Sequence, residues 1–219
     1  MNFFELLNIS PGVTAVIGSG GKTSLLRRLA AEAPGTVLLC TTTHIRPFAE
    51  YPLLTDAAAE TVLQALTSER VLCVGTPCEN GKLTAPRLPM ETLAALADYM
   101  LVEADGSRQM PLKAHAAHEP VIPACAERVI CVAGASGFDR PIRACVHRPE
   151  RFCALTGAAE TDTVAPLLAA QAILTEGLCD TVFLNQVDNA AAFLRQRGVC
   201  KEIGESGFSA HCRDCSAIL

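Results

Sequence analysis

The segment that most constrains this chain is VIGSGGKTSLL, residues 16–26, in which an apolar run meets three glycines and then a helix-forming stretch. Gly21, Lys22 and Thr23 match the end of the P-loop pattern, which lies between a strand and a helix. The first glycine of that pattern would fall at Val16, so the match is incomplete and Gly18 and Gly20 supply the flexibility instead. The alternative is an ordinary glycine-rich turn with an exposed lysine.

As a phosphate site, the loop would direct its backbone N–H groups at phosphate oxygens, aided by the positive end of the helix that follows. Lys22 is predicted to reach the β- and γ-phosphates as a catalytic cation, and the Thr23 hydroxyl to ligate Mg²⁺. The predicted nucleotide-binding residues here are Gly18, Ser19, Gly20, Gly21, Lys22, Thr23 and Ser24.

Apolar strands and helical patterns alternate along the chain, which predicts an α/β fold: a mostly parallel sheet with helices on both faces, P-loop NTPase-like. Strands are expected at 12–18, 35–43, 70–76, 99–105, 128–134 and 180–188, helices at 23–32, 55–68, 90–99, 161–177 and 189–198, and a hairpin at 78–86. We expect a single domain over residues 1–219. The irregular stretches 106–127 and 134–160 are expected to be functional loops.

Two acids follow the strand expected at 99–105, in the sequence YMLVEAD. The carboxyl ends of parallel strands are where such sheets bind ligands, so Glu103 and Asp105 are predicted catalytic and Mg²⁺-binding residues. Which of the two holds the metal is left open. The alternative is a solvated acidic turn, since Asp-Gly is a common turn sequence.

Two further strand ends carry polar residues. Thr42, in the run TTTH, would lie near the P-loop if its strand neighbours the first one, and it is a candidate substrate contact; threonine is also an ordinary strand residue. Asn185 and Asp188, in LNQVD, resemble the Asn-Lys-x-Asp element that reads guanine, with Gln186 in place of the lysine. Base contact is predicted, with ATP, GTP and CTP all left open.

Composition excludes some classes of function. The net charge is −5 without a basic block, so we expect no nucleic-acid binding. No apolar run reaches the roughly 18 residues of a membrane span, so no membrane association is expected. Eleven cysteines, an odd number scattered through apolar runs, indicate buried reduced thiols and a cytoplasmic protein. Cys200, His211, Cys212 and Cys215 have the residue types of a zinc site, but 200–219 could equally be a Cys-rich tail.

Several stretches together resemble the YqeC family, accessory proteins of selenium-dependent molybdenum hydroxylases. They are GSGGKTSLL (18–26), TTTHI (41–45), NGKL (80–83), VEADGSRQMPLKAHAAHEPVIP (102–123), HRPE (147–150), LTG (155–157) and LNQVD (184–188). The resemblance implies a P-loop NTPase-like fold and a role in maturing a selenium- and molybdenum-containing cofactor, with the apo-enzyme as a partner. Ser19 replaces the family's usual alanine and Gln186 its more usual lysine.

The loop after the acids carries basic groups suited to an anionic second substrate. Arg108, Lys113 and His118 are candidate contacts for a small anionic or pterin-like molecule beside the γ-phosphate; the alternative is a surface loop with ordinary charges. Two functions fit: an NTP hydrolase or nucleotide-dependent transferase acting on that molecule, or a nucleotide-switched chaperone that delivers cofactor to the apo-enzyme.

Overall fold

A computed structural model describes residues 2–187 and the backbone of residues 209–212. The chain divides into two compact units. Unit 1 contains Met1–Val16, Thr23–Asp105 and Val121–Val129, and unit 2 contains Ile17–Lys22, Gly106–Pro120 and Ile130–Leu219. The chain therefore passes between the units on either side of the glycine-rich loop. The single domain expected over residues 1–219 stays a prediction.

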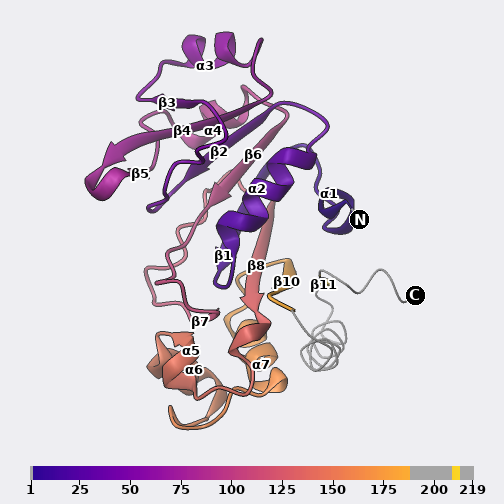
Figure 1. The fold of residues 1–219 in the computed structure, drawn as a ribbon, viewed down its shortest axis with the longest axis vertical. Coiled ribbons are helices and arrows are strands. Elements are labelled where there is room, and N and C mark those ends of the chain that lie inside the picture. The colour runs from indigo at the N-terminus through magenta and orange to yellow at the C-terminus, as the bar shows by residue number, and fades with distance from the viewer. Residues whose placement is uncertain (1, 188–208, 213–219) are drawn as a thin grey trace. The chain divides into compact units, whose positions relative to one another are not determined.

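Unit 1 is built on a parallel sheet whose order is β1-β6-β2-β4-β3 (Figure 1). Its strands are β1 (Gly12–Gly18), β2 (Val37–Thr41), β3 (Leu53–Thr55), β4 (Val71–Cys78) and β6 (Tyr99–Glu103). A short strand, β5 (Lys82–Thr84), pairs antiparallel with β4 and confirms the expected hairpin. Its helices are α1 (Phe3–Leu6), α2 (Lys22–Glu32), α3 (Ala59–Ala65) and α4 (Met90–Ala94).

Helices cover both faces of this sheet. Val62 of α3 and Leu93 of α4 pack with Leu38, Leu72 and Met100, which share one face of the strands. Side chains of a strand alternate between faces, so Glu103 of β6 lies on the opposite face from Met100. Thr23 of α2 contacts Glu103, which places α2 on that opposite face. The predicted α/β fold with helices on both sides is confirmed.

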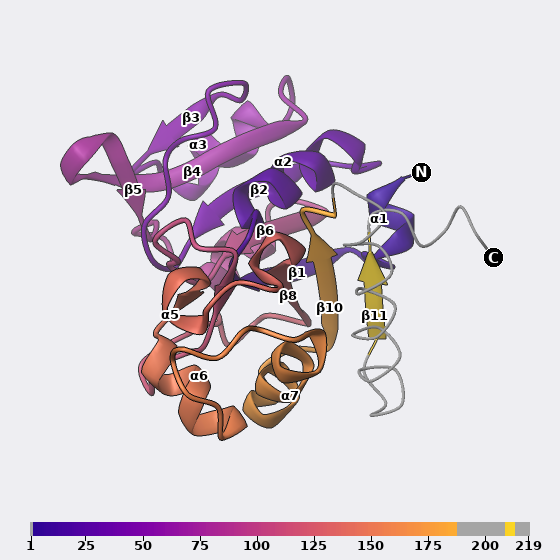
Figure 2. The ribbon, with the colours of Figure 1, turned by 60° about the horizontal axis from the view of Figure 1, so that its bottom comes forward.

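Unit 2 contains the parallel strands β8 (Arg128–Gly134), β10 (Thr181–Asn185) and β11 (Ser209–Cys212), in the order β8-β10-β11. A second pair of strands joins β7 (Leu112–Lys113) to β9 (Val146–His147). Helices α5 (Ile142–Cys145), α6 (Pro149–Thr156) and α7 (Pro166–Glu176) complete the described part, and α6 packs beside α7 (Figure 2). The core of the unit includes Phe152, Ala169, Ile173 and Phe183.

Several predicted boundaries need correction. The helix expected at 55–68 begins only at Ala59, because Leu53–Thr55 pairs with β4 as strand β3. The helix expected at 90–99 ends at Ala94. The helix expected at 161–177 begins at Pro166, and Gly177 ends it in the left-handed conformation, as predicted. The helix expected at 189–198 lies outside the described residues.

Candidate functional site

The glycine-rich loop, residues 18–22, lies within unit 2, and its glycines are required by backbone geometry. Gly20 has φ +85°, and a Cβ atom there would lie 2.5 Å from the Gly134 nitrogen and 2.7 Å from the Pro111 carbonyl oxygen. Gly21 has φ +125°, where a Cβ would meet the side chain of Asn185 at 2.2 Å. A side chain at either position would both strain the backbone and collide with neighbours. The tight path of this loop therefore depends on glycine.

Lys22 is the first residue of α2 and is only 4% exposed. Its ammonium donates to the Gly18 carbonyl oxygen at 2.8 Å, so the side chain folds back over the loop that precedes it. It also donates to the Ser107 hydroxyl at 3.0 Å. The lysine thus joins the glycine-rich loop to the segment that follows Asp105 in sequence.

Three further bonds hold the loop in place. The Ser19 N–H donates to the Val132 carbonyl of β8 at 2.8 Å, and the Ser19 hydroxyl donates to the Met110 carbonyl. The Asn185 amide donates to the Gly20 carbonyl at 2.9 Å. The Ser19 N–H is therefore committed to β8, so not every N–H of residues 18–23 points inward as expected. Asn185, predicted to contact a base, here supports the loop, while Asp188 lies outside the described residues.

Unit 1 contains a hydroxyl–carboxylate pair of the kind that binds Mg²⁺. The Thr23 hydroxyl donates to Glu103 Oε2 at 2.9 Å, and Glu103, the last residue of β6, is 7% exposed. Asp105, two residues beyond, is fully buried. A hydroxyl and buried carboxylates are hard oxygen ligands, so the donor set suits Mg²⁺, which takes few protein ligands and completes its shell with water and phosphate oxygens. Ser24, by contrast, is exposed on α2.

The position predicted for Thr42 was conditional on its strand neighbouring β1, and that condition is not met. Strand β6 pairs with both β1 and β2 and so separates them. The Thr42 hydroxyl donates to the Val121 carbonyl at 2.6 Å, and the Thr41 hydroxyl donates to the Glu103 carbonyl at 2.7 Å. In unit 1 these threonines bind the backbone around the acids.

The loop after Asp105 carries its three candidate contacts in different environments. Arg108 and His118 are exposed, whereas the Lys113 side chain is 0% exposed and pairs with Glu119 at 2.9 Å. Arg148 donates to both oxygens of the same carboxylate, at 2.9 and 3.0 Å. Partial burial raises the pKa of Glu119, but the bonds from Arg148 and Lys113 outweigh it and lower that pKa to about 2.

Sequence reasoning missed the two acids that organise this loop. Glu119 binds Lys113 and Arg148, and Glu176 at the end of α7 accepts from the His115 N–H at 2.6 Å and contacts the His115 ring nitrogen Nδ1 at 2.8 Å. Arg148 is 29 residues from Glu119 in the chain, and His115 is 61 residues from Glu176. The HRPE stretch, residues 147–150, was the one signal that pointed to Arg148.

The eight described cysteines are free thiols, and five of them, including Cys40, Cys73 and Cys131, are buried. Burial raises the pKa of the Cys73 thiol to about 11, which keeps it protonated. Cys153, expected to be buried, is only half-buried. Among residues 2–187, no cluster of three histidine, cysteine or acidic side chains could hold a metal ion by itself. The suggested zinc site falls on Cys200 and Cys215, outside the described residues, and on His211 and Cys212, whose side chains are not described.

Within the described part of the chain, every helix is too short or too polar to cross a membrane.

The sequence model of the YqeC protein family matches residues 14–150. A curated protein of Escherichia coli (strain K12), named "Uncharacterized protein YqeC", is 38% identical over 159 residues, which cover 67% of this chain and 61% of that protein. The matched part thus spans less than two thirds of the relative's length. No solved structure gives a significant match.

Proposed function

Because the chain belongs to the YqeC family, we propose that it binds a nucleoside triphosphate with Mg²⁺ and acts in the maturation of the cofactor of a selenium-dependent molybdenum hydroxylase. The maturation role follows from the family resemblance. The proposal that the chain binds a nucleotide is based on its own residues.

The observation that carries the proposal is the placement of Lys22. A lysine at the first turn of a helix, buried and folded over a tight glycine loop, is the arrangement that holds phosphates in nucleotide-binding proteins. Burying an ammonium costs free energy unless anionic or polar groups surround it. Two of its partners are the Gly18 carbonyl oxygen and the Ser107 hydroxyl, which are neutral acceptors. A phosphate is a stronger partner for this cation than either.

The metal would be held by Thr23 and Glu103, with Asp105 as a second carboxylate. When bound, Mg²⁺ would neutralise charge on the phosphates and polarise the bond to be broken. Thr23 is the residue after Lys22, so the loop that takes the phosphates continues directly into a metal ligand.

The reaction we favour is nucleotide-dependent activation or group transfer on a small anionic or pterin-like molecule. One contact supports the alternative, a nucleotide-switched chaperone that delivers cofactor to the apo-enzyme. Lys22 binds Ser107, so a phosphate that attracts Lys22 would change how the segment after Asp105 is held. An enzyme should consume nucleotide in step with a small molecule, and a chaperone should hydrolyse it slowly until the apo-enzyme is added.

The test is equilibrium binding of ATP, GTP and CTP, each measured with Mg²⁺ and with a chelator. We expect binding that requires Mg²⁺, with one base preferred. Asn185→Ala separates two roles of that residue: loop support predicts equal weakening for all three nucleotides, whereas base contact predicts a changed order. Asp188→Asn tests the base independently. Absence of binding to all three nucleotides would overturn the proposal.

A further inference from the structure

Thr41 is a buried polar residue at the end of an apolar strand. All five residues of β2 are buried, and the four that precede Thr41 are apolar. Thr41 itself is 0% exposed. A valine has nearly the same shape and suits a buried strand equally well, so the feature that needs an explanation is the hydroxyl. Burying a hydroxyl costs free energy unless it is hydrogen-bonded.

The Thr41 hydroxyl makes two hydrogen bonds. It donates to the Glu103 carbonyl oxygen at 2.7 Å and accepts from the Thr43 N–H at 3.0 Å. A carbonyl can only accept and a backbone N–H can only donate, so the direction of both bonds is fixed. The Thr42 N–H also donates to the Glu103 carbonyl, at 3.2 Å. The end of β2 therefore directs two donors at one carbonyl of β6.

Glu103 is held at its backbone and at its carboxylate. Thr41 lies opposite Glu103 where β2 pairs with β6, so the two side chains project to the same face of the sheet (Figure 1). On that face the Thr23 hydroxyl of α2 donates to the carboxylate at 2.9 Å. On the other side of β6, the Ala104 N–H donates to the Val16 carbonyl of β1 at 3.0 Å. Bonds from both neighbouring strands thus fix the backbone that presents the carboxylate.

We propose that Thr41 is a positioning residue for Mg²⁺ binding, and that its hydroxyl sets the affinity for the metal by fixing Glu103. This inference rests on the proposed function and deepens it, because it names a residue outside the ligands on which metal binding depends. The Thr41 hydroxyl acts through the backbone of Glu103 and is not itself a ligand.

Two features make this bond important for the metal. Thr41 and Glu103 are the last residues of their strands, so the regular ladder of the sheet ends at this pair. Mg²⁺ requires nearly ideal octahedral geometry, so a ligand that is slightly displaced binds it poorly. Groups that hold a ligand in place therefore affect metal affinity almost as strongly as the ligands do.

The experiment measures the Mg²⁺ concentration that gives half-maximal triphosphate binding to the full chain. The nucleotide is whichever of ATP, GTP and CTP the unaltered protein binds most tightly. Thr41→Val removes the hydroxyl and should raise that Mg²⁺ concentration by about tenfold. Thr41→Ser keeps a hydroxyl and should stay within about twofold of the unaltered protein. Thr14→Val is the control, because it changes a buried threonine of β1 that lies opposite Leu101, and it should leave the Mg²⁺ requirement unchanged.

Hydrogen exchange without nucleotide gives a second measurement, which does not depend on the metal. Peptides covering residues 100–105 should exchange about threefold faster or more in Thr41→Val, but not in Thr41→Ser or Thr14→Val. Should Thr41→Val not fold, Thr41→Ala takes its place, because it removes the hydroxyl without placing a methyl group against the carbonyl.

Two results would overturn the inference. One is an unchanged Mg²⁺ requirement in the folded protein that lacks the hydroxyl. The other is a Thr41→Ser protein as impaired as Thr41→Val, because the hydroxyl would then not be the group that matters. Failure of the proposed function looks different: the unaltered protein would itself bind no triphosphate, or bind it equally with Mg²⁺ and with a chelator, and the inference would fall with it.

Discussion

The Lys22 ammonium donates a hydrogen bond to the Ser107 hydroxyl across 3.0 Å, so a residue of the glycine-rich loop directly holds the segment that follows Asp105. The two residues are 85 positions apart in the chain. This contact connects the predicted phosphate site to the loop that carries the predicted substrate contacts, and it gives a test of coupling between them.

Ser107→Ala should loosen that segment. Loss of a bond to a charged group removes protection, so peptides covering residues 106–112 should exchange backbone hydrogens about threefold to tenfold faster than in the unaltered protein. Ser68→Ala is the control, at an exposed serine whose hydroxyl donates to the carbonyl of Ala65, the last residue of α3.

The same measurement tests nucleotide coupling. In the unaltered protein, residues 106–123 should be more protected with a non-hydrolysable triphosphate than with diphosphate or no nucleotide. Equal protection in all three states would contradict coupling and favour a static site.

Gly20→Ala should be among the most destabilising substitutions of a glycine in the chain. The new Cβ would lie 2.5 Å from a backbone nitrogen at φ +85°, so strain and collision add, and we expect a loss of about 3 kcal/mol or more in the free energy of unfolding. Gly81→Ala is the matched control. It shares a positive φ of 64° but has no atom within 4 Å of the new Cβ, so it should cost only about 1 kcal/mol. Urea unfolding measures both, and equal losses would contradict the tight packing of the loop.

Glu103→Gln and Asp105→Asn should have a larger effect on nucleotide turnover and its Mg²⁺ dependence than on the free energy of unfolding. Each substitution keeps the size of the side chain and removes its charge, and we expect at least about tenfold slower turnover for one of the two. Glu91→Gln, at an exposed acid in the first turn of α4, is the control. Unchanged turnover and unchanged Mg²⁺ dependence in both variants would make these acids structural.

The Glu119 ion pairs should contribute stability that depends on pH. The pKa of Glu119 is lowered to about 2 from its ordinary value of 4.5, so its contribution is present above pH 4.5 and is lost as the pH falls toward 2. The free energy of unfolding should therefore fall more steeply over that range in the unaltered protein than in Glu119→Gln. Parallel pH profiles would show that the carboxylate is not held by Arg148 and Lys113 as described.

The sequence predicted those features that depend on local patterns. Apolar runs and glycine positions predict four of these features. They are the strand at 128–134, the hairpin formed by β4 and β5, the helix that begins at Lys22 and the helix that ends at Gly177. The boundary error near Leu53 has a physical cause: that segment becomes a strand only because β4 offers it a partner. Pairing of this kind is a tertiary interaction that local propensity does not contain.

The arrangement around the candidate site was predictable only in part. The glycine loop and the acids at the end of β6 were found because each is a short motif. The condition set for Thr42, that its strand neighbours β1, is not met because strand order differs from chain order and β6 lies between β1 and β2. Its role as a substrate contact stays a prediction. Glu119 and Glu176 were missed because Arg148 and His115, which they bind, lie 29 and 61 residues away in sequence, and an acidic residue carries no sign of such a partner.

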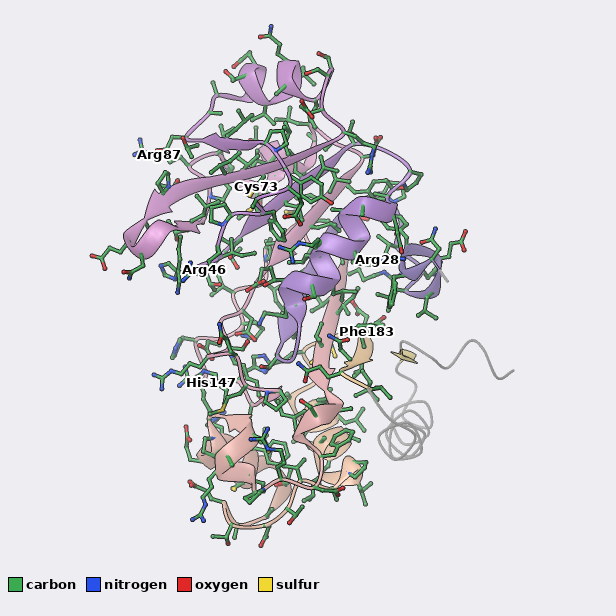
Figure 3. The ribbon with its side chains drawn as sticks, in the orientation of Figure 1. Arg28, Arg46, Cys73, Arg87, His147 and Phe183 are labelled. Atoms are coloured by element: carbon green, nitrogen blue, oxygen red, sulfur yellow. The ribbon has the colours of Figure 1, made fainter. Side chains whose placement is uncertain are left out.

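The most direct test of the central claim is the triphosphate affinity of Lys22→Ala measured against Arg28→Ala. Both remove one cation from α2, but Lys22 is buried over the glycine loop. Arg28, labelled in Figure 3, is exposed and pairs with Glu32. We predict that Lys22→Ala weakens binding of a Mg²⁺–triphosphate by about 100-fold, since it removes a charged bond to phosphate, and that Arg28→Ala changes it by less than about twofold. Equal affinities for the two folded variants would contradict a phosphate site at this loop.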